Sequence, residues 1–377
     1  MEAAALRLRH ATPEEVGVAP DAAAGICRAA RRGVEISRYP GAVVLAAKDG
    51  LIFIHRAFGH AVLYRDRRRL LPEDERVPMQ EDTIFDLASL TKLFTAMAAV
   101  QLAERGHLDL DEPVAGYLPR LSGRGKERIT PRHLLTHTSG LPALVHLEDL
   151  STHEERVSAV YRVPLLAEPG TRHLYGDPNM ILSGWLVERV SGMPLDDYVR
   201  ANITAQLGMT DTFYNPPESM RPCIAATEYK PDRGMVRGVV HDENAHALGG
   251  VSGHAGLFST ARDLAALAQS LLDGGGGILK ESSVREMLSD QTPHLPGCAQ
   301  GLGFELDREW YMDGLASPQT AGHTGFTGTS LVIDLRHRAF VILLTNRVHP
   351  TREGESINPQ RRAVARALLE AVDQGLP

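Results

Sequence analysis

Ser89 and Lys92, three residues apart, are the side chains in this sequence best placed for nucleophilic chemistry. They begin an apolar run that contains no Gly or Pro before Gly106. Such a run predicts a buried helix that ends at a left-handed Gly106. The spacing puts the Ser89 hydroxyl and the Lys92 amine on one face, near the positive N-terminus of the helix. Burial among apolar neighbours favours a neutral Lys92 that accepts the Ser89 proton.

The same tetrapeptide is also compatible with a capping serine and a solvated lysine, so companion motifs decide between the two interpretations. Tyr175-Gly176-Asp177 leads into an amphipathic run over residues 180–190, which Gly192 ends. His323-Thr324-Gly325 opens an apolar run near the other end of the chain. Each motif stands at the start of a predicted element, where a side chain can face a pocket.

The elements that must hold these motifs are strands at both chain ends and helices between them. Two predicted strands, residues 41–47 and 51–55, join through an Asp-Gly turn, and two more span 323–334 and 339–346. Further helices are predicted at residues 20–32, 131–135, 194–207, 262–272 and 359–372. We therefore expect an α/β (α+β) protein: one antiparallel sheet built from both chain ends, flanked by helices, with an inserted and mostly helical lobe.

The predicted lobe boundaries follow from that order of elements. Residues 1–84 and 255–377 are expected to form the sheet lobe, and residues 85–254 the helical lobe, as one catalytic unit overall. The pocket is expected between the lobes.

Composition limits the classes of function. The 377 residues are 43% apolar and 23% charged, which is typical of a folded protein, and the net charge of -7 argues against nucleic-acid binding. Cys27, Cys223 and Cys298 lack a metal or disulfide spacing and fit a reducing compartment. Residues 1–10 lack the apolar core of a secretory signal, and no run is long enough for a membrane helix. We expect a cytoplasmic protein with no membrane partner.

Other stretches carry weaker signals. The Gly-rich segments 249–256 and 274–277 do not fit a phosphate-binding fingerprint, so no cofactor is expected. The histidines of His241-Asp242-Glu243-Asn244-Ala245-His246 do not match a known ligand spacing, so no metal is expected, and a loop beside the pocket is the better interpretation. No Gly-x-Ser-x-Gly elbow occurs, which disfavours an α/β-hydrolase.

The three motifs, in this order and on these elements, resemble those of the serine β-lactamase and penicillin-binding-protein superfamily. The chain is most similar to the class C β-lactamase-related group, which includes family VIII carboxylesterases and D,D-peptidase-like enzymes. Leu135-Thr136-His137-Thr138-Ser139-Gly140-Leu141 and Thr345-Asn346-Arg347 support the resemblance, which covers roughly residues 35–370. It implies a β-lactamase/transpeptidase-like fold.

The resemblance also implies a role for each motif residue. Ser89 is the nucleophile, Lys92 and Tyr175 transfer its proton, and the backbone N–H groups of Ser89 and Phe326 form the oxyanion hole. Substrate-binding residues are Asp177, His323, Thr324 and Gly325. This chain has Asp177 where the group usually has Asn, and His323 where it commonly has Lys.

Three functions are compatible with these residues. The first is a serine hydrolase of the carboxylesterase type that acts on a small-molecule ester or amide through a Ser89 acyl-enzyme. The second is a D,D-peptidase or β-lactamase, against which the missing secretory signal argues. The third is a non-catalytic binding or regulatory homologue.

His323 bears on the choice of substrate. With an ordinary pKa of about 6.5 it is mostly neutral above pH 7, so neutral esters are expected to be preferred, and carboxylate-bearing substrates to gain as pH falls. Arg347 or Arg352 is an alternative source of positive charge in the pocket.

Overall fold

Strands from both ends of the chain form one central sheet in the computed structural model, which describes residues 8–373. The strand order is β1-β3-β2-β13-β12-β11-β10, with β4 added on β3. Their bounds are β1 Arg9–His10, β2 Gly41–Lys48, β3 Leu51–Val62, β4 Val77–Pro78, β10 Glu305–Leu306, β11 Thr320–Thr324, β12 Ser330–Asp334 and β13 Ala339–Thr345. All pairs are antiparallel except β1 with β3. The predicted fold class is confirmed.

The two long N-terminal strands show why this sequence forms a sheet buried on both faces. Val43 and Leu45 of β2 pack into the larger core, and Ala42 and Val44 pack into the second core on the opposite face. This alternation follows from the two-residue period of a strand. The connecting turn has positive φ at Asp49–Gly50 (49° and 79°), which suits the Asp-Gly pair.

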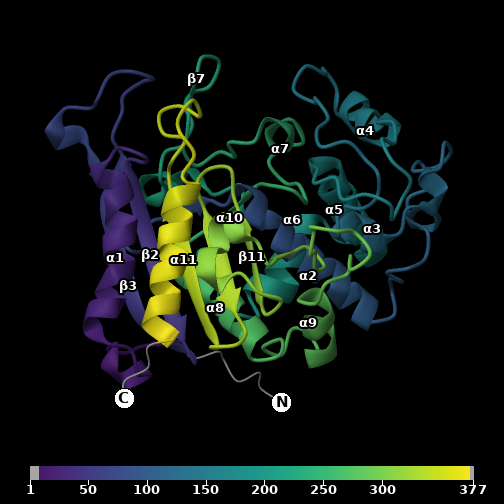
Figure 1. Ribbon diagram of the computed structural model, residues 1–377. Coiled ribbons are helices and arrows are strands. Elements are labelled where there is room, and N and C mark those ends of the chain that lie inside the picture. The colour runs from purple at the N-terminus through teal and green to yellow at the C-terminus, as the bar shows by residue number, and fades with distance from the viewer. Residues whose placement is uncertain (1–7, 374–377) are drawn as a thin grey trace.

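Helices cover both faces of the sheet. The helices α1 (Pro20–Glu35) and α11 (Asn358–Asp373) lie side by side over one face, as Figure 1 shows. On the other face, α8 (Ala261–Leu272) packs against β2 and β13. The sheet is therefore the middle of three layers.

The helical lobe lies beside these layers, with α3, α4 and α5 grouped on the right of Figure 1. Helix α10, Glu309–Met312, lies between β10 and β11 and packs against α11. Besides α8, the helices between β4 and β10 are α2 Thr91–Glu104, α3 Pro131–Leu135, α4 His153–Arg162, α5 Asp177–Ser191, α6 Leu195–Val199, α7 Glu243–Ala247 and α9 Glu281–Met287, most of them in the helical lobe. Two small sheets, β5-β9-β6 (Phe85–Asp86, Leu257–Ser259, Phe213–Tyr214) and β7-β8 (Tyr229–Lys230, Gly234–Met235), complete it. Helix α2 is buried on all sides from Thr91 to Leu102.

Two expectations about elements were wrong. The run predicted as one strand over residues 323–334 is two strands, β11 and β12, because the chain turns back between Gly325 and Thr329. The helix predicted over residues 194–207 is the short α6 followed by a π-helical turn, Arg200–Thr204.

Other expectations lie outside what the structure decides. The lobe boundaries at residues 84 and 255 stay a prediction. Residues 1–7, most of the segment in which a secretory core is missing, are outside the described residues. Within residues 8–373, no helix has the length and apolar character required to cross a membrane.

Candidate active site

Ser89 lies in a tight turn just ahead of α2. The turn, Ala88–Leu90, is 3-10 helical, and Ala88 adopts a left-handed φ of 47° that non-glycine residues seldom take. The Asp86 carboxylate holds this backbone by accepting a hydrogen bond from the Ala88 N–H at 2.9 Å. The turn presents the Ser89 side chain to the pocket, while its neighbours Ala88 and Leu90 are buried.

Lys92 lies one turn further along and is fully buried. Its ammonium donates to Ser89 Oγ at 2.7 Å, to Asp177 Oδ1 at 3.0 Å and to the His254 carbonyl oxygen at 3.4 Å. The predicted Ser89–Lys92 contact is therefore present.

The expected neutral state of Lys92 is corrected by the same geometry. Burial alone lowers the pKa of Lys92, but the charge of Asp177 and the Tyr175 phenol outweigh burial, and the pKa is raised. Lys92 is thus the cation of a buried ion pair, because residue 177 is a carboxylate and not the uncharged Asn that the resemblance leads one to expect.

Tyr175 lies beside this pair at the entrance to α5. The Lys92 ammonium is 4.9 Å from the centre of the Tyr175 ring, and 38% of the Tyr175 side chain is exposed on the pocket side. Desolvation of its hydroxyl raises the pKa of Tyr175, whereas the charge of Lys92 and hydrogen bonding to Lys92 and Ser89 oppose that rise. The phenol therefore lines the same pocket as Ser89, beside the Lys92 cation.

The end of β11 approaches the Ser89 turn closely. Thr327 Oγ1 donates to the Asp86 carbonyl oxygen at 2.7 Å, and Thr329 Oγ1 donates to the Leu87 carbonyl oxygen at 3.0 Å. A Cβ on Gly325 would lie 2.4 Å from Leu87 O, so only glycine allows this approach. Phe326, the predicted second oxyanion donor, follows directly and lines the pocket with Ser89.

His323 is on β11 but is not a titrating surface residue. Only 2% of it is exposed, and its Nδ1 lies 2.7 Å from the Thr324 carbonyl oxygen. Burial, reinforced by the charge of Lys92, lowers the pKa of His323 to about 3. The expected gain of positive charge near pH 6.5 is therefore wrong, and His323 stays neutral at every physiological pH.

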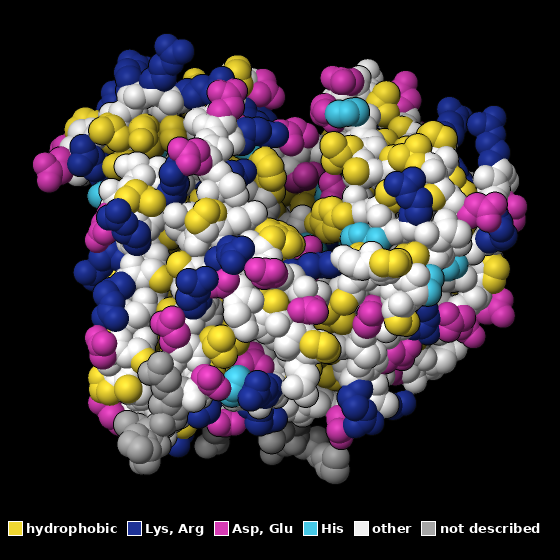
Figure 2. All heavy atoms as spheres, in the orientation of Figure 1, with side chains coloured by type: hydrophobic (Ala, Val, Ile, Leu, Met, Phe, Trp, Pro, Cys, Tyr) yellow, Lys and Arg dark blue, Asp and Glu magenta, His cyan; other side chains and the backbone are white. Residues whose placement is uncertain are grey.

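These residues surround one pocket of about 660 Å³. Figure 2 shows the molecular face hollowed near its centre, between the two lobes. The predicted residues that line the pocket are Ser89, Tyr175, His323, Thr324, Gly325 and Phe326. Lys92 and Asp177 reach the site through their bonds to Ser89 and to each other.

Sequence reasoning missed several residues of the pocket wall. Arg361 of α11 is buried and donates to the carbonyl oxygens of Gly325 and Thr329 at 2.8 and 3.0 Å, which fixes the turn after β11. Glu305 and Trp310 also line the pocket. For Arg361 the sequence offered one signal, which is that Asn358 and Arg361 stand three residues apart at the start of a predicted helix.

Asp242 and His254 form a further layer behind Lys92. His254 Nε2 lies 2.8 Å from Asp242 Oδ1, and the ligand atoms of Asp177, Asp242 and His254 all lie within 4.8 Å of one another. A metal ion bound by this group would meet the Lys92 ammonium, which is 3.0 Å from Asp177 Oδ1. We therefore assign these residues to the support of Lys92 rather than to a metal centre.

The fold and the Ser-Lys-Tyr geometry define a serine hydrolase of the β-lactamase type, and comparison with known proteins agrees. The Beta-lactamase family model matches residues 27–366, so the chain belongs to the beta-lactamase family. A curated relative from Escherichia coli, named "Putative D-alanyl-D-alanine carboxypeptidase", is 33% identical over 93% of this chain and 88% of its own length.

Solved structures give the same assignment. Simvastatin synthase (LovD) from Aspergillus terreus superposes with a TM-score of 0.72 at 26% identity, over 94% of this chain and 99% of that one. EstCE1, described as a hydrolase with promiscuous acyltransferase activity, has a TM-score of 0.71 over 91% of this chain and 98% of its own, and its 24% identity shows a shared fold. The predicted superfamily is confirmed.

Proposed function

We propose that this serine hydrolase cleaves small acyl esters through an acyl-enzyme on Ser89. The observation that carries the proposal is the Lys92 ammonium, 2.7 Å from Ser89 Oγ and 3.0 Å from the Asp177 carboxylate. The positive charge of Lys92 favours the serine alkoxide and the Tyr175 phenolate alike.

The proposed steps follow from the charge of Lys92. Because Lys92 already carries a proton, the acceptor of the Ser89 proton is Tyr175 in its phenolate form, which arises when the phenol loses its own proton to water beside the Lys92 cation. Ser89 Oγ attacks the ester carbonyl, and the Ser89 and Phe326 N–H groups stabilise the oxyanion. Tyr175 then returns the proton to the departing alcohol, and in the second half-reaction it accepts a proton from the attacking water.

An ester substrate is supported by the uncharged His323. Where a Lys would hold a fixed cation beside β11, this chain has a neutral ring whose pKa is about 3. The likeness to EstCE1, described as a hydrolase with promiscuous acyltransferase activity, accords with hydrolysis by acyl transfer. The unpaired Cys27, Cys223 and Cys298 support a reducing compartment, as expected for the cytoplasm.

A second candidate, a D,D-carboxypeptidase, is favoured by Arg347 and by the name of the Escherichia coli relative. Arg347 lines the pocket, donates from Nε to the Phe326 carbonyl oxygen at 3.0 Å and lies over the Phe326 ring. Among residues 8–373 Arg347 forms no ion pair, whereas its neighbour in the pocket, Arg352, is paired with Glu228 and Glu243. A peptide carboxylate would meet that cation.

Labelling and a substrate panel test these proposals. A fluorophosphonate should add once to the wild-type protein and not to Ser89→Ala, as read by intact mass. p-Nitrophenyl esters should turn over faster than D-Ala-D-Ala peptides or a chromogenic cephalosporin. An adduct that persists in Ser89→Ala refutes the nucleophile, peptide preference selects the second candidate, and no adduct at all supports a non-catalytic homologue.

A further inference from the structure

A second cavity, of about 510 Å³, adjoins the catalytic pocket. It lies between the β7–β8 hairpin, α4 and α7, and Arg352 lines both spaces. Arg352 lies over the Phe326 ring, 5.6 Å from its centre, so one guanidinium separates the second cavity from the proposed oxyanion hole. The cavity is lined by six basic side chains: Arg67, Arg156, Lys230, Arg233, His246 and Arg352.

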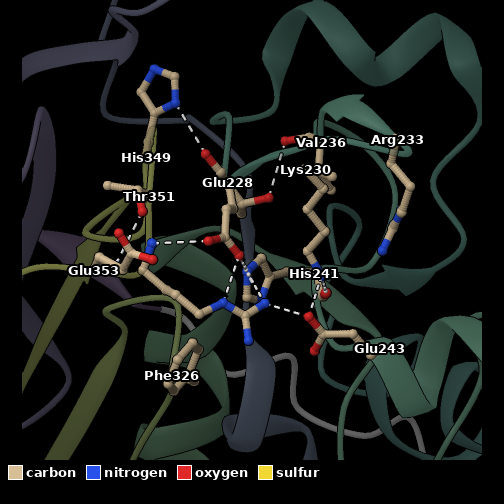
Figure 3. Close-up of polar contacts among 12 residues, drawn as sticks. Glu228, Lys230, Arg233, Val236, His241, Glu243, Phe326, His349, Thr351 and Glu353 are labelled. Carbon is tan, nitrogen blue, oxygen red and sulfur yellow. Dashed lines mark hydrogen bonds and ion pairs between the residues drawn. The ribbon is translucent and has the colours of Figure 1, made fainter. Parts of the chain in front are cut away.

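Most carboxylates of this cavity are already paired. The Arg352 guanidinium donates from Nε to Glu228 at 2.7 Å and from Nη2 to Glu243. The Lys230 ammonium also donates to Glu243, at 2.6 Å, and Figure 3 shows Lys230 extending toward Glu243. Of the others, Glu353 pairs with Arg67 at 3.0 Å, and Glu148 lies 3.2 Å from His146 Nδ1, a contact that is an ion pair only when His146 is protonated. Asp232 is the one lining carboxylate with no contact of this kind among the residues that the structure describes.

Arg156 and Arg233 have no carboxylate partner in the described part of the chain. Arg156 donates to the backbone carbonyl oxygens of Leu150 at 3.0 Å and Ala247 at 2.7 Å. Arg233 donates to that of Val240 at 2.7 Å. Within the described residues, no hydrogen bond involves Nη2 of Arg156 or Nε and Nη1 of Arg233. Both guanidinium groups therefore keep free donors.

His246 shows that these cations face the same space. Burial is the largest cause of the lowered pKa of His246. The charges of Arg233, Lys230 and Arg156 lower this pKa further, and only the charge of Asp232 opposes them. Lys230 and Arg233 extend in the same direction from the β7–β8 hairpin in Figure 3. The lining as a whole has as many Lys and Arg side chains as carboxylates, but in the corner around His246 the cations Arg156, Lys230 and Arg233 face Asp232 alone.

We propose that this corner binds an oxyanion group, carboxylate or phosphate, at the far end of an extended substrate whose ester reacts at Ser89. Guanidinium groups with free donors bind such oxygens through paired, charge-assisted hydrogen bonds. Because Arg352 lines both spaces, a substrate that extends past its guanidinium would reach from the catalytic pocket into the second cavity. The role of the cavity as part of the substrate site rests on the proposed esterase function.

Direct binding tests the anion site without any turnover. Inorganic pyrophosphate is titrated calorimetrically at low salt into Ser89→Ala and into the same protein carrying Arg156→Gln, Arg233→Gln or both. Each substitution should weaken binding about tenfold, since one charge-assisted contact is lost. Arg162→Gln is the matched control, because Arg162 is an exposed residue of α4 outside the cavity.

Arg233→Lys and Arg156→Lys are controls for folding, because they keep the positive charge. Their affinity for pyrophosphate should stay within about threefold of that of the parent, and their melting temperature should be unchanged. Absence of pyrophosphate binding, or equal affinity in the double Gln variant, overturns the site.

Turnover then tests the link to the substrate. Activated esters whose acyl chains end in a carboxylate are compared with methyl-ended esters of equal length. Above a threshold length the carboxylate should raise kcat/KM, and Arg233→Gln should abolish the gain without affecting the methyl series. A gain independent of length or of Arg233 overturns the extended-substrate role. If no ester is hydrolysed, the esterase proposal fails while the pyrophosphate titration still reports on the cavity.

Discussion

Lys92 and Asp177 form a buried ion pair, with 3.0 Å between Nζ and Oδ1 and with 0% and 15% of their side chains exposed. The ion pair keeps Lys92 protonated, because its attraction more than offsets the cost of burying an ammonium group. Ser89 Oγ therefore faces a cation, and the proton-accepting role passes to Tyr175. Lys92 and Asp177 are 85 positions apart, so the sequence around either residue does not reveal the pair.

Asp177→Asn should move the acidic limb of the kcat/KM profile to lower pH, by roughly one to three units. The Asp177 charge raises the pKa of both Lys92 and Tyr175, so its removal lowers both values. The direction is therefore the same whichever of the two accepts the Ser89 proton. The limb is measured from the pH dependence of kcat/KM with a p-nitrophenyl ester, after the spontaneous hydrolysis of the ester is subtracted.

Thermal melting of Asp177→Asn must match the parent before this profile is interpreted, because the substitution leaves Lys92 buried without its partner. A limb that stays in place, with folding intact, would mean that neither Lys92 nor Tyr175 determines the acidic limb.

Lys92→Ala and Tyr175→Phe should each slow acylation by roughly 10²–10⁴-fold, as is typical for the loss of a proton-transfer group. The double variant should lose little more, because the Lys92 cation stabilises the alkoxide that proton transfer to Tyr175 creates, and losses within one such step are not additive. Stopped-flow release of p-nitrophenol in a single turnover isolates acylation. If the two losses multiply, the residues act in separate steps.

Gly325→Ala should impair both stability and turnover. The added Cβ would lie 2.0 Å from Thr329 Oγ1 and 2.4 Å from Leu87 O, so the end of β11 must move away from the Ser89 turn. We expect a loss of about 1–3 kcal/mol in the free energy of unfolding and a kcat at least tenfold lower, through displacement of the Phe326 N–H. Urea unfolding and steady-state kinetics measure the two effects.

Gly116→Ala is the matched control, since a Cβ at Gly116 meets nothing within 4 Å. Equal behaviour of the two variants would show that the close approach at Gly325 is not needed.

Local sequence rules predicted the elements and the order of the motifs well. Gly106 and Gly192 both end helices with φ of 71°, and Thr130 caps α3 through its side chain, as their residue types indicate. Ser89 and Lys92 meet as expected because three residues make one helical turn.

The charges of the site were not predictable in this way. The charge of Lys92 depends on Asp177 and the neutrality of His323 depends on burial, and both are set by the packing of distant segments. The break between β11 and β12 was missed because residues 326–329 contain β-forming threonines, whereas Arg361, which secures that turn, comes from the last helix.

Selectivity between carboxylate-bearing and neutral esters should not change between pH 8 and 5.5. At pH 5.5 a histidine with a pKa of about 3 is protonated in less than about 1% of molecules, so His323 adds no charge. Arg361, whose pKa burial lowers to about 10, keeps its charge throughout. The measurement is the ratio of kcat/KM for a carboxylate-bearing ester to that for its methyl ester, taken across this range.

Glu305 is the competing group, because burial raises the pKa of its carboxyl and it lines the same pocket. The ratio is therefore measured also in His323→Asn and in Glu305→Gln. A ratio that rises on acidification and flattens in His323→Asn alone would show that His323 titrates after all, and hence that water reaches it. A rise that disappears only in Glu305→Gln would assign the charge to Glu305 and leave His323 neutral, in agreement with its low pKa.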